Sequence, residues 1–300
     1  MTPRRGHGLV VPVYGLGDDA AFSDFRQRVV ALRQVLDLVV LVDNNPVPDG
    51  RLATLEREGC DIIINANRGG LAGGFNAGIR RQIAAGACWI SLLDQDSRVE
   101  PAALAQLPEA WEQLPNRLLL VGPAIWDQGS GRRHGEASLR PGPLAGGPYQ
   151  ATRLLISSGS TFRAHDWPLL GGFHEELFID FLDHAWSFRA GSRGFLLLQD
   201  ERVVLWQRFG AHHPNPLCRR LGMQLYSPRR HYYGLRNLRW LCRQPEVPLD
   251  LKLKEVLKML VKPWLWLLFE PQRRANARAI LAALRDPVPL PRHHSKADDC

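Results

Sequence analysis

The sequence predicts an α/β protein, in which a mostly parallel, Rossmann-like sheet is flanked by helices and followed by a basic, helical C-terminal extension. Two observations support this prediction. Short apolar runs of strand length alternate with stretches whose apolar residues recur at helical spacing, which is typical of β-α-β units and a parallel sheet. The last third of the 300 residues is rich in arginine, histidine, tryptophan and tyrosine, and its arginines supply much of the formal net charge of +8.

The first third of the chain has the most regular pattern. A strand is expected over residues 9–14, followed by a helix from about residue 20 to 36 with apolar positions that include Phe25 and Val29. Further strands and helices then alternate: a strand at 38–42, a short helix at 52–58, a strand at 61–64, a glycine-rich helix that ends at Gly86 and a strand that begins at Trp89. This order predicts right-handed β-α-β connections.

The pattern is less regular beyond residue 100. The expected elements are a helix over 101–111, a strand over 121–126, a polar loop or hairpin over 127–150, a strand over 154–162 and a helix around 175–189. We expect residues 1–240 to form one domain and residues 241–300 a helical, basic region. Within that region, 249–269 alternates lysine with apolar residues, which is typical of a helix lying on an anionic bilayer and equally of a helix packed on the protein core.

Polar residues end three successive apolar runs: Asp43, then Asn65 and Asn67, then Asp94 and Asp96. The carboxyl ends of parallel strands meet at one edge of a sheet, and open α/β sheets bind ligands at that edge. Asp94 and Asp96 are two residues apart in an extended segment, so both side chains point to the same side. They suit a hard cation such as Mg²⁺ or Mn²⁺, which would bind a diphosphate in turn; helix capping or loop solvation is the alternative.

Residues 68–79 form a glycine-rich stretch that excludes two nucleotide-binding classes. The stretch lacks Gly-Lys-Ser/Thr and does not fit Gly-x-Gly-x-x-Gly, so neither a P-loop NTPase nor a dinucleotide-dependent dehydrogenase is predicted. Its glycines allow either a close approach of the backbone to a ligand or tight packing of a helix on a strand.

Two further pairs of residues are candidates for chemistry. On the helix expected around them, Asp180 and Asp183 would lie one turn apart on one face, where a carboxylate could act as general base for a hydroxyl, cap the helix or pair with Arg189. The adjacent His212 and His213 could bind a metal or form a surface turn.

Composition excludes several other classes of protein. The five cysteines are odd in number and widely spaced, without a Cys-x-x-Cys pair, which argues against a disulfide framework or a zinc ribbon and for reduced thiols. The amino terminus lacks an apolar stretch of signal-peptide length, and the segment 256–269 contains Lys258, Lys262 and Pro263 and is too short to cross a bilayer. We therefore expect a cytoplasmic protein.

Five segments in a fixed order are more specific than any single motif. They are Val39-Val-Leu-Val-Asp-Asn44, Asn67-Arg-Gly-Gly-Leu-Ala-Gly-Gly-Phe-Asn-Ala-Gly78, Leu93-Asp-Gln-Asp-Ser97, Gly171-Gly-Phe173 with Leu177-Phe-Ile-Asp-Phe-Leu-Asp-His-Ala-Trp186, and Ser227-Pro-Arg-Arg-His-Tyr-Tyr-Gly-Leu-Arg-Asn237. Together they resemble glycosyltransferase family 2 and, within it, the bacterial rhamnosyltransferases. The similarity runs from about Val10 to Asn237.

The resemblance implies a GT-A fold and an inverting, metal-dependent transfer from a nucleoside diphosphate sugar. Asp94 and Asp96 would match the family's metal-and-diphosphate motif, and Asp183 its catalytic base. Asp43 would recognise the pyrimidine base. The wall of the nucleotide-sugar pocket would include Asn67, Gly69, Gly70 and Asn76, and the acceptor side would include Asp180, Trp186 and Arg236.

Two positions depart from the family pattern. Many relatives have an acidic residue where this chain has Ala185, and often a histidine where it has Gln207. Because that histidine can belong to the metal site, His212 or His213 is a candidate replacement ligand.

The function expected from the resemblance is transfer of L-rhamnose from dTDP-L-rhamnose to a lipid-linked or other cell-envelope glycan, with Mg²⁺ or Mn²⁺ as cofactor. The basic C-terminal third would hold the enzyme on the cytoplasmic face of the inner membrane. UDP-galactofuranose or a UDP-hexose is the alternative donor. A non-catalytic nucleotide or nucleic-acid binding protein is the alternative from another class, and nucleic-acid affinity would fall steeply with salt.

Overall fold

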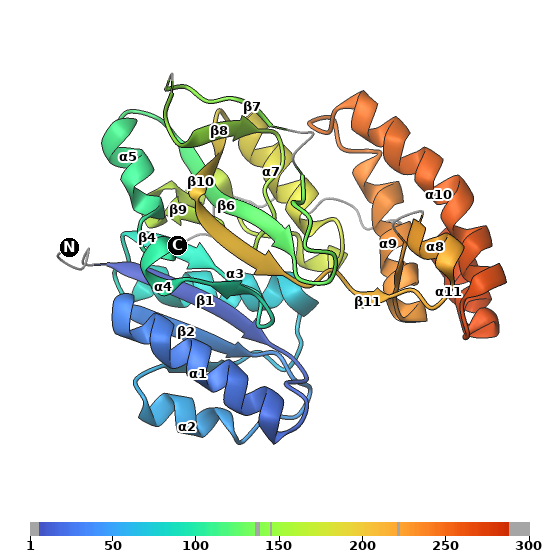
Figure 1. Ribbon diagram of the computed structural model, residues 1–300, viewed down its shortest axis with the longest axis horizontal. Coiled ribbons are helices and arrows are strands. Elements are labelled where there is room, and N and C mark those ends of the chain that lie inside the picture. The colour runs from blue at the N-terminus through green and yellow to red at the C-terminus, as the bar shows by residue number, and fades with distance from the viewer. Residues whose placement is uncertain (1–5, 136–138, 145, 221–222, 288–300) are drawn as a thin grey trace.

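The computed structural model describes residues 6–135, 139–144, 146–220 and 223–287. The strands of its main sheet are β1 (His7–Val13), β2 (Leu38–Asp43), β3 (Asp61–Ile64), β4 (Trp89–Leu92), β5 (Arg98–Val99), β6 (Leu119–Asp127), β7 (Arg140–Pro141), β8 (Tyr149–Thr152), β9 (Thr161–Arg163) and β10 (Leu196–Gln207). Within the described ranges these ten strands form one sheet, in the order β3-β2-β1-β4-β9-β6-β10-β8-β7 with β5 paired to β10 (Figure 1).

Helices of very different length surround the sheet. The α-helices are α1 (Asp19–Val35), α2 (Leu52–Arg57), α3 (Gly70–Ala84), α4 (Pro101–Leu104), α5 (Ala110–Gln113), α6 (Trp167–Leu170), α7 (Leu182–Ser192), α8 (Pro216–Arg220), α9 (Pro228–Leu241), α10 (Leu249–Phe269) and α11 (Arg273–Arg285). Short 3-10 turns are η1 (Leu107–Glu109), η3 (Ala164–Asp166) and η4 (Glu175–Leu177), and a two-stranded ribbon pairs β11 (Ala211–His212) with β12 (Gln224–Leu225).

The first half of the sheet has the expected parallel arrangement. Strand β1 pairs in parallel with β2 and β4, and β2 pairs in parallel with β3. Alternate residues of these strands enter two cores: Val10 packs with the residues of α3, whereas Leu9 packs with those of α1. The two helices therefore cover opposite faces, and all four strands end at the same edge.

Close packing of α3 on the sheet explains part of the glycine-rich stretch. A Cβ atom at Gly78 would lie 2.2 Å from Cγ1 of Val10, and one at Gly74 would lie 3.1 Å from Cβ of Pro12. Gly69 and Gly70 serve a different purpose, because both have positive φ and a Cβ at Gly70 would lie 2.5 Å from the carbonyl oxygen of Phe178. The stretch thus allows tight helix packing at one end and a close approach of two backbone segments at the other.

The second half of the sheet differs from the expectation. Only β6 and β10 pair in parallel there, while short strands pair antiparallel with β4, β6 and β10. The expected helix over 101–111 is divided into α4, η1 and α5, and Pro108 lies at this division. The expected strand over 154–162 begins only at Thr161, because Ser157 to Ser160 form a turn with Gly159 at φ 82°.

The C-terminal helices α9, α10 and α11 pack against one another at one side of the sheet (Figure 1). Their shared apolar contacts include Leu235 of α9, Trp266 of α10 and Ile280 of α11. Most of the apolar side chains of α10 nevertheless face away from the protein, as shown by Leu260 at 63% and Trp264 at 67% exposure. No helix within the described ranges is both long and apolar enough to cross a membrane.

Candidate active site

A cavity of about 450 Å³ lies at the edge where β1, β2 and β4 end. From the sheet side it is lined by residues that follow these strands, including Tyr14, Asn44, Asp94 and Asp96. The opposite wall comes from distant parts of the chain, namely Phe178 and Ile179 before α7 and Arg229, Arg230 and Tyr233 of α9. Of the strand-end residues expected to meet at one edge, Asn67, Asp94 and Asp96 line this cavity, whereas Asp43 and Asn65 do not.

The pKa of Asp94 is strongly shifted by its surroundings. Its Oδ2 accepts a hydrogen bond of 2.9 Å from Nε2 of Gln207, but its buried Oδ1 has no donor among the described residues. Burial, together with the charges of Asp96 and Asp183, raises the pKa of Asp94 to about 7. A buried carboxylate oxygen without a donor, beside two other carboxylates, is suited to a cation.

Asp96 is more exposed than Asp94. Burial raises the pKa of Asp96 above that of an ordinary carboxyl group, and the charges of Arg28, Arg208 and Arg230 oppose this increase. No group of three or more His, Cys, Asp and Glu side chains is arranged to bind a metal in the described part of the chain. The donor set nevertheless fits Mg²⁺ or Mn²⁺, because these ions are commonly held by one or two carboxylates and completed by substrate phosphates and water.

Gln207, for which a histidine was expected from the resemblance, contacts Asp94 directly through its amide group. Its Oε1 accepts from the hydroxyl of Ser97, which also hydrogen-bonds the hydroxyl of Ser158 at 2.7 Å. His213 is buried, and its Nδ1 accepts a hydrogen bond of 3.1 Å from the backbone N–H of Asn215. The backbone of His212 lies in β11, but its side chain is outside the part that the structure describes.

Asp183 is the second residue of α7, and its Oδ1 accepts a hydrogen bond of 2.9 Å from the backbone N–H of Ser157. Burial raises the pKa of Asp183 above that of an ordinary carboxyl group. The alternative of an ion pair with Arg189 does not occur among the described contacts: the Arg189 guanidinium instead donates to the carbonyl groups of Leu170 and Gly171. Asp183 lies close enough to Asp94 for its charge to raise the pKa of that carboxyl group.

The prediction that Asp180 and Asp183 share one helix face is wrong. Phe178, Asp180 and Phe181 have φ values of 66°, 63° and 63°, so the helix begins only at Leu182. Left-handed backbone at three non-glycine residues is strained and requires support from its surroundings. Asp180 therefore belongs to a strained loop and not to the helix that carries Asp183.

Two neighbouring residues of α9 support this loop. Nδ2 of Asn237 donates to the carbonyl groups of Leu177, Ile179 and Asp180 at 2.8, 2.7 and 3.0 Å. Nη2 of Arg236 donates to the carbonyl oxygen of Glu176 at 2.6 Å. Arg236, expected at the acceptor side, contacts the backbone that positions Asp180.

Arg230 lies among the acidic side chains of the site. Its Nε donates to Oδ1 of Asp180 at 3.0 Å, and its charge opposes the burial effect on the pKa of Asp94, Asp96 and Asp183. One arginine thus partly balances four carboxylates. Arg229 and Tyr233 stand beside it in the cavity wall.

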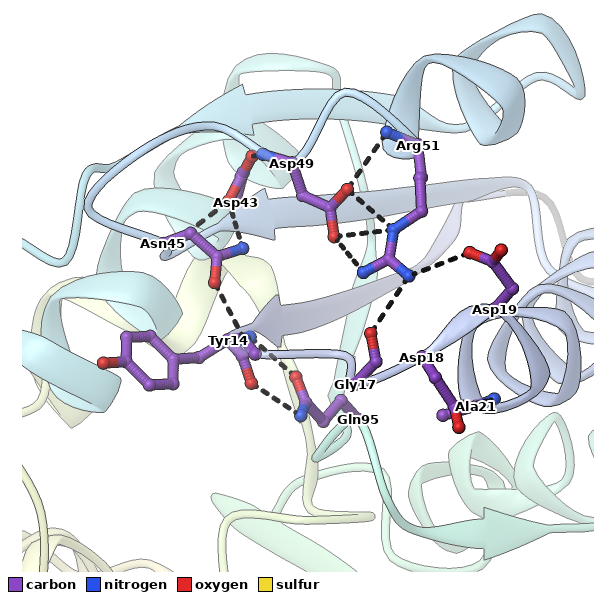
Figure 2. Close-up of polar contacts among 11 residues, drawn as sticks. Tyr14, Gly17, Asp18, Asp19, Ala21, Asp43, Asn45, Asp49, Arg51 and Gln95 are labelled. Carbon is purple, nitrogen blue, oxygen red and sulfur yellow. Dashed lines mark hydrogen bonds and ion pairs between the residues drawn. The ribbon is translucent and has the colours of Figure 1, made fainter.

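The carboxylate of Asp43 organises the loop that follows β2. Its Oδ1 accepts from the backbone and side-chain N–H groups of Asn45 at 3.0 and 2.8 Å, and its Oδ2 accepts from the N–H of Asp49 at 2.7 Å (Figure 2). Gln95 and the backbone of Tyr14 exchange two hydrogen bonds nearby, and Figure 2 shows the Tyr14 ring pointing away from this network. Asp43 is therefore buried behind the loops that border the cavity.

Four residues expected around the site do not line the cavity. Asn76 bridges α3 to Phe173, whose N–H donates to Oδ1 at 2.8 Å and whose carbonyl accepts from Nδ2 at 2.9 Å. Trp186 is fully buried and donates from Nε1 to the carbonyl oxygen of Gly171 at 3.1 Å. Gly69 and Gly70 contact the loop before α7, whereas Asn67 does line the cavity.

Sequence reasoning did not assign several residues of the cavity wall: Tyr14, Gln95, Phe178, Arg229, Arg230 and Tyr233. The last three belong to the twelve-residue segment 226–237, whose density of basic and tyrosine residues was an available signal. Tyr14 and Gln95 carry no such signal, because each adjoins a strand end without being part of a charged or repeated pattern.

Residues 24–166 match the family model described as Glycosyl transferase family 2. The chain carries a glycosyltransferase family 2 domain. The dTDP-rhamnosyl transferase RfbF of Shigella flexneri is similar to this glycosyltransferase, with 27% identity over 243 residues that cover 78% of this chain and 80% of RfbF. The resemblance found in the sequence is thereby confirmed.

Solved structures confirm the GT-A fold of the glycosyltransferase. S. aureus TarS 1-349 in complex with UDP-GlcNAc superposes with a TM-score of 0.55 and 15% identity, covering 94% of this chain and 81% of TarS 1-349. GalNAc-T7 with UDP, GalNAc and Mn²⁺ gives a TM-score of 0.56 and 15% identity; the match covers 94% of this chain and 58% of GalNAc-T7.

Proposed function

We propose that this glycosyltransferase transfers L-rhamnose from dTDP-L-rhamnose, with inversion, to a hydroxyl of a lipid-linked or other cell-envelope glycan. The observation that carries the proposal is the carboxylate group Asp94, Asp96 and Asp183 beside a cavity with a basic opposite wall. The similarity to RfbF, a dTDP-rhamnosyl transferase, supports the choice of nucleotide and sugar.

The donor would bind in the cavity at the strand ends. Asp94 and Asp96 would hold Mg²⁺ or Mn²⁺, and Arg229 and Arg230, which line the opposite wall, would contact the diphosphate. The divalent ion, when bound, offsets the negative charge that develops on the departing diphosphate. Asp43 would act on the nucleobase through the loop that it orders, and Asn67 would border the nucleotide sugar.

Asp183 would be the general base. Burial raises its pKa, which makes the carboxylate a stronger base, and the N–H of Ser157 fixes its orientation. As the acceptor oxygen bonds to the anomeric carbon, the bond from that carbon to the diphosphate oxygen breaks, and Asp183 receives the hydroxyl proton. Attack opposite the leaving group inverts the configuration in one step.

The exposed apolar face of α10 supports a peripheral position on an anionic membrane. Leu257, Leu260 and Trp264 are 55%, 63% and 67% exposed on this face, and Lys254 and Lys258 lie on the same helix. A helix with exposed aliphatic and aromatic side chains and flanking lysines has the chemistry of an interfacial helix. Such a position would place the enzyme where lipid-linked acceptors occur.

A thermal-shift screen of nucleotides tests the proposed function. Because a ligand that binds only the folded protein raises its melting temperature, dTDP should raise Tm in the presence of Mn²⁺ or Mg²⁺ and much less with EDTA. UDP in place of dTDP distinguishes the alternative donors. Absence of a metal-dependent shift with either nucleotide would contradict the proposal.

A further inference from the structure

A second cavity, of about 340 Å³, is lined by none of the residues that line the donor cavity. One wall is the turn after β6, with Asp127, Arg132 and Arg133, and another is α10, with Lys262 and Trp266. Tyr226 completes the lining on the side of the donor cavity.

The charge of this cavity favours an anion. Its single lining carboxylate, Asp127, is occupied by its own turn, because it accepts from the N–H groups of Gly129 and Ser130 at 3.1 Å each and from the Ser130 hydroxyl at 2.6 Å. Arg133 pairs with Glu201 at 2.5 Å. Arg132 and Lys262 have no side-chain ion pair among the described contacts.

Tyr226 and Arg230 connect this cavity to the acidic side chains of the site. The Arg230 guanidinium, which lines the donor cavity, lies 4.3 Å from the centre of the Tyr226 ring, and the same arginine pairs with Asp180 at 3.0 Å. Lys262 is close enough for its charge to lower the pKa of Asp180. A ligand in the second cavity would therefore be near the side from which an acceptor must approach Asp183.

An apolar surface adjoins the cavity. Lys262 stands on α10 between Val261 and Leu260, exposed at 55% and 63%, and Trp264, exposed at 67%. A cationic cavity beside an exposed apolar helix face matches a ligand that combines a phosphate with a hydrocarbon chain. An anion without a hydrocarbon chain would make no contact with this apolar surface of α10.

We propose that the second cavity binds the phosphate or diphosphate of a lipid-linked acceptor, with Arg132 and Lys262 contacting the anion and the lipid chain lying along α10. This inference rests on the proposed function, since it names the acceptor class of the same reaction. It also explains why charged and apolar groups meet at this place on α10.

The test uses the full chain with its donor cavity saturated by dTDP and Mn²⁺, so that diphosphate probes must bind elsewhere. Farnesyl diphosphate, inorganic pyrophosphate and farnesol are titrated calorimetrically. We expect farnesyl diphosphate to bind more tightly than either of the other probes. Lys262→Ala and Arg132→Ala should each weaken its binding about tenfold, as removal of one charge-assisted contact does.

Arg80→Ala is the control, because Arg80 is an exposed arginine on α3, away from α10, and lines neither cavity. It should leave all three affinities unchanged. Unaltered farnesyl diphosphate binding in both cavity variants would overturn the proposal, as would equal affinity for farnesol. Equal affinity for pyrophosphate would replace the lipid-borne ligand by a free diphosphate. The shift in Tm caused by dTDP reports separately on the proposed function.

Discussion

The two walls of the donor cavity are built in different ways. The sheet wall, with Asp94 and Asp96, follows from regular β-α-β units whose strands all end at one edge. The opposite wall depends on a strained loop that Asn237 holds from a distant helix. The position of the sheet wall is therefore determined by regular β-α-β units, whereas the position of the opposite wall depends on hydrogen bonds between residues far apart in the sequence.

The largest expected effect comes from the base side. Asp183→Asn keeps an Oδ1 acceptor for the N–H of Ser157 but removes the basic carboxylate, so transfer should fall about 10³-fold. The Tm shift caused by dTDP and metal should be nearly unchanged. Asp250→Asn, at an exposed carboxylate paired with Arg153, is the control and should retain activity. Loss of nucleotide binding together with activity would identify Asp183 as a structural carboxylate.

Loss of the loop support should have a smaller effect on the same wall. Asn237→Ala removes three hydrogen bonds to loop carbonyl groups and should destabilise the fold by about 2 kcal/mol or more. Transfer should fall at temperatures well below Tm, because the loop before Asp183 is no longer held.

Asn276→Ala is the matched control for that variant, since Asn276 is also buried but bonds to Glu270 and not to the loop. It should lower Tm without lowering transfer in the folded protein. Equal losses of transfer in both variants would show that α9 supports general stability only.

On the sheet wall, we expect the replacement of Asp94 to stabilise the metal-free protein. The Asp94 carboxyl ionises near pH 7 in the folded protein but at about pH 4 when unfolded, so its burial costs stability increasingly as the pH rises between these values. Asp94→Asn should therefore raise the metal-free Tm at pH 8 by about 3 °C or more and not at pH 4. A lower Tm of Asp94→Asn at pH 8 would show that the folded protein already stabilises the ionised Asp94 carboxylate.

The smallest effect concerns membrane contact, which lies outside both walls. Trp264→Glu should weaken binding to vesicles of phosphatidylglycerol and phosphatidylcholine about thirtyfold, because burial of one such side chain contributes about 2 kcal/mol. Tm should not change. Leu169→Glu, exposed on α6, should bind like the unchanged protein. Unchanged vesicle binding with a change from dimer to monomer would instead assign this face to a second copy.

The same contrast explains how far the sequence could predict the molecule. Apolar periodicity identified β1 to β4 with α1 and α3, and the polar strand ends Asn67, Asp94 and Asp96 do line one cavity. Periodicity could not predict left-handed backbone at Phe178, Asp180 and Phe181, because non-glycine residues adopt it only under tertiary constraint.

Side-chain roles were harder to predict than strand positions. Asn76 and Trp186 belong to motif segments, yet their side chains bond to the backbone of Phe173 and Gly171 outside the cavity. A sequence motif indicates that a residue is needed at its position. It does not distinguish a side chain that contacts the ligand from one that holds the backbone in place. Arg230 reaches the carboxylates only because α9 packs across the loop, which no local pattern encodes.

The central claim is that Asp94 and Asp96 bind a divalent ion together with the diphosphate of the donor. Calorimetric titration of Mn²⁺ with and without dTDP tests it most directly, in the unchanged protein and in Asp96→Ala. Because the proposed metal site has two carboxylate ligands, Mn²⁺ should bind at least about tenfold more tightly with dTDP, and Asp96→Ala should abolish this gain. Mn²⁺ affinity that is independent of dTDP, or unchanged in Asp96→Ala, would contradict the account.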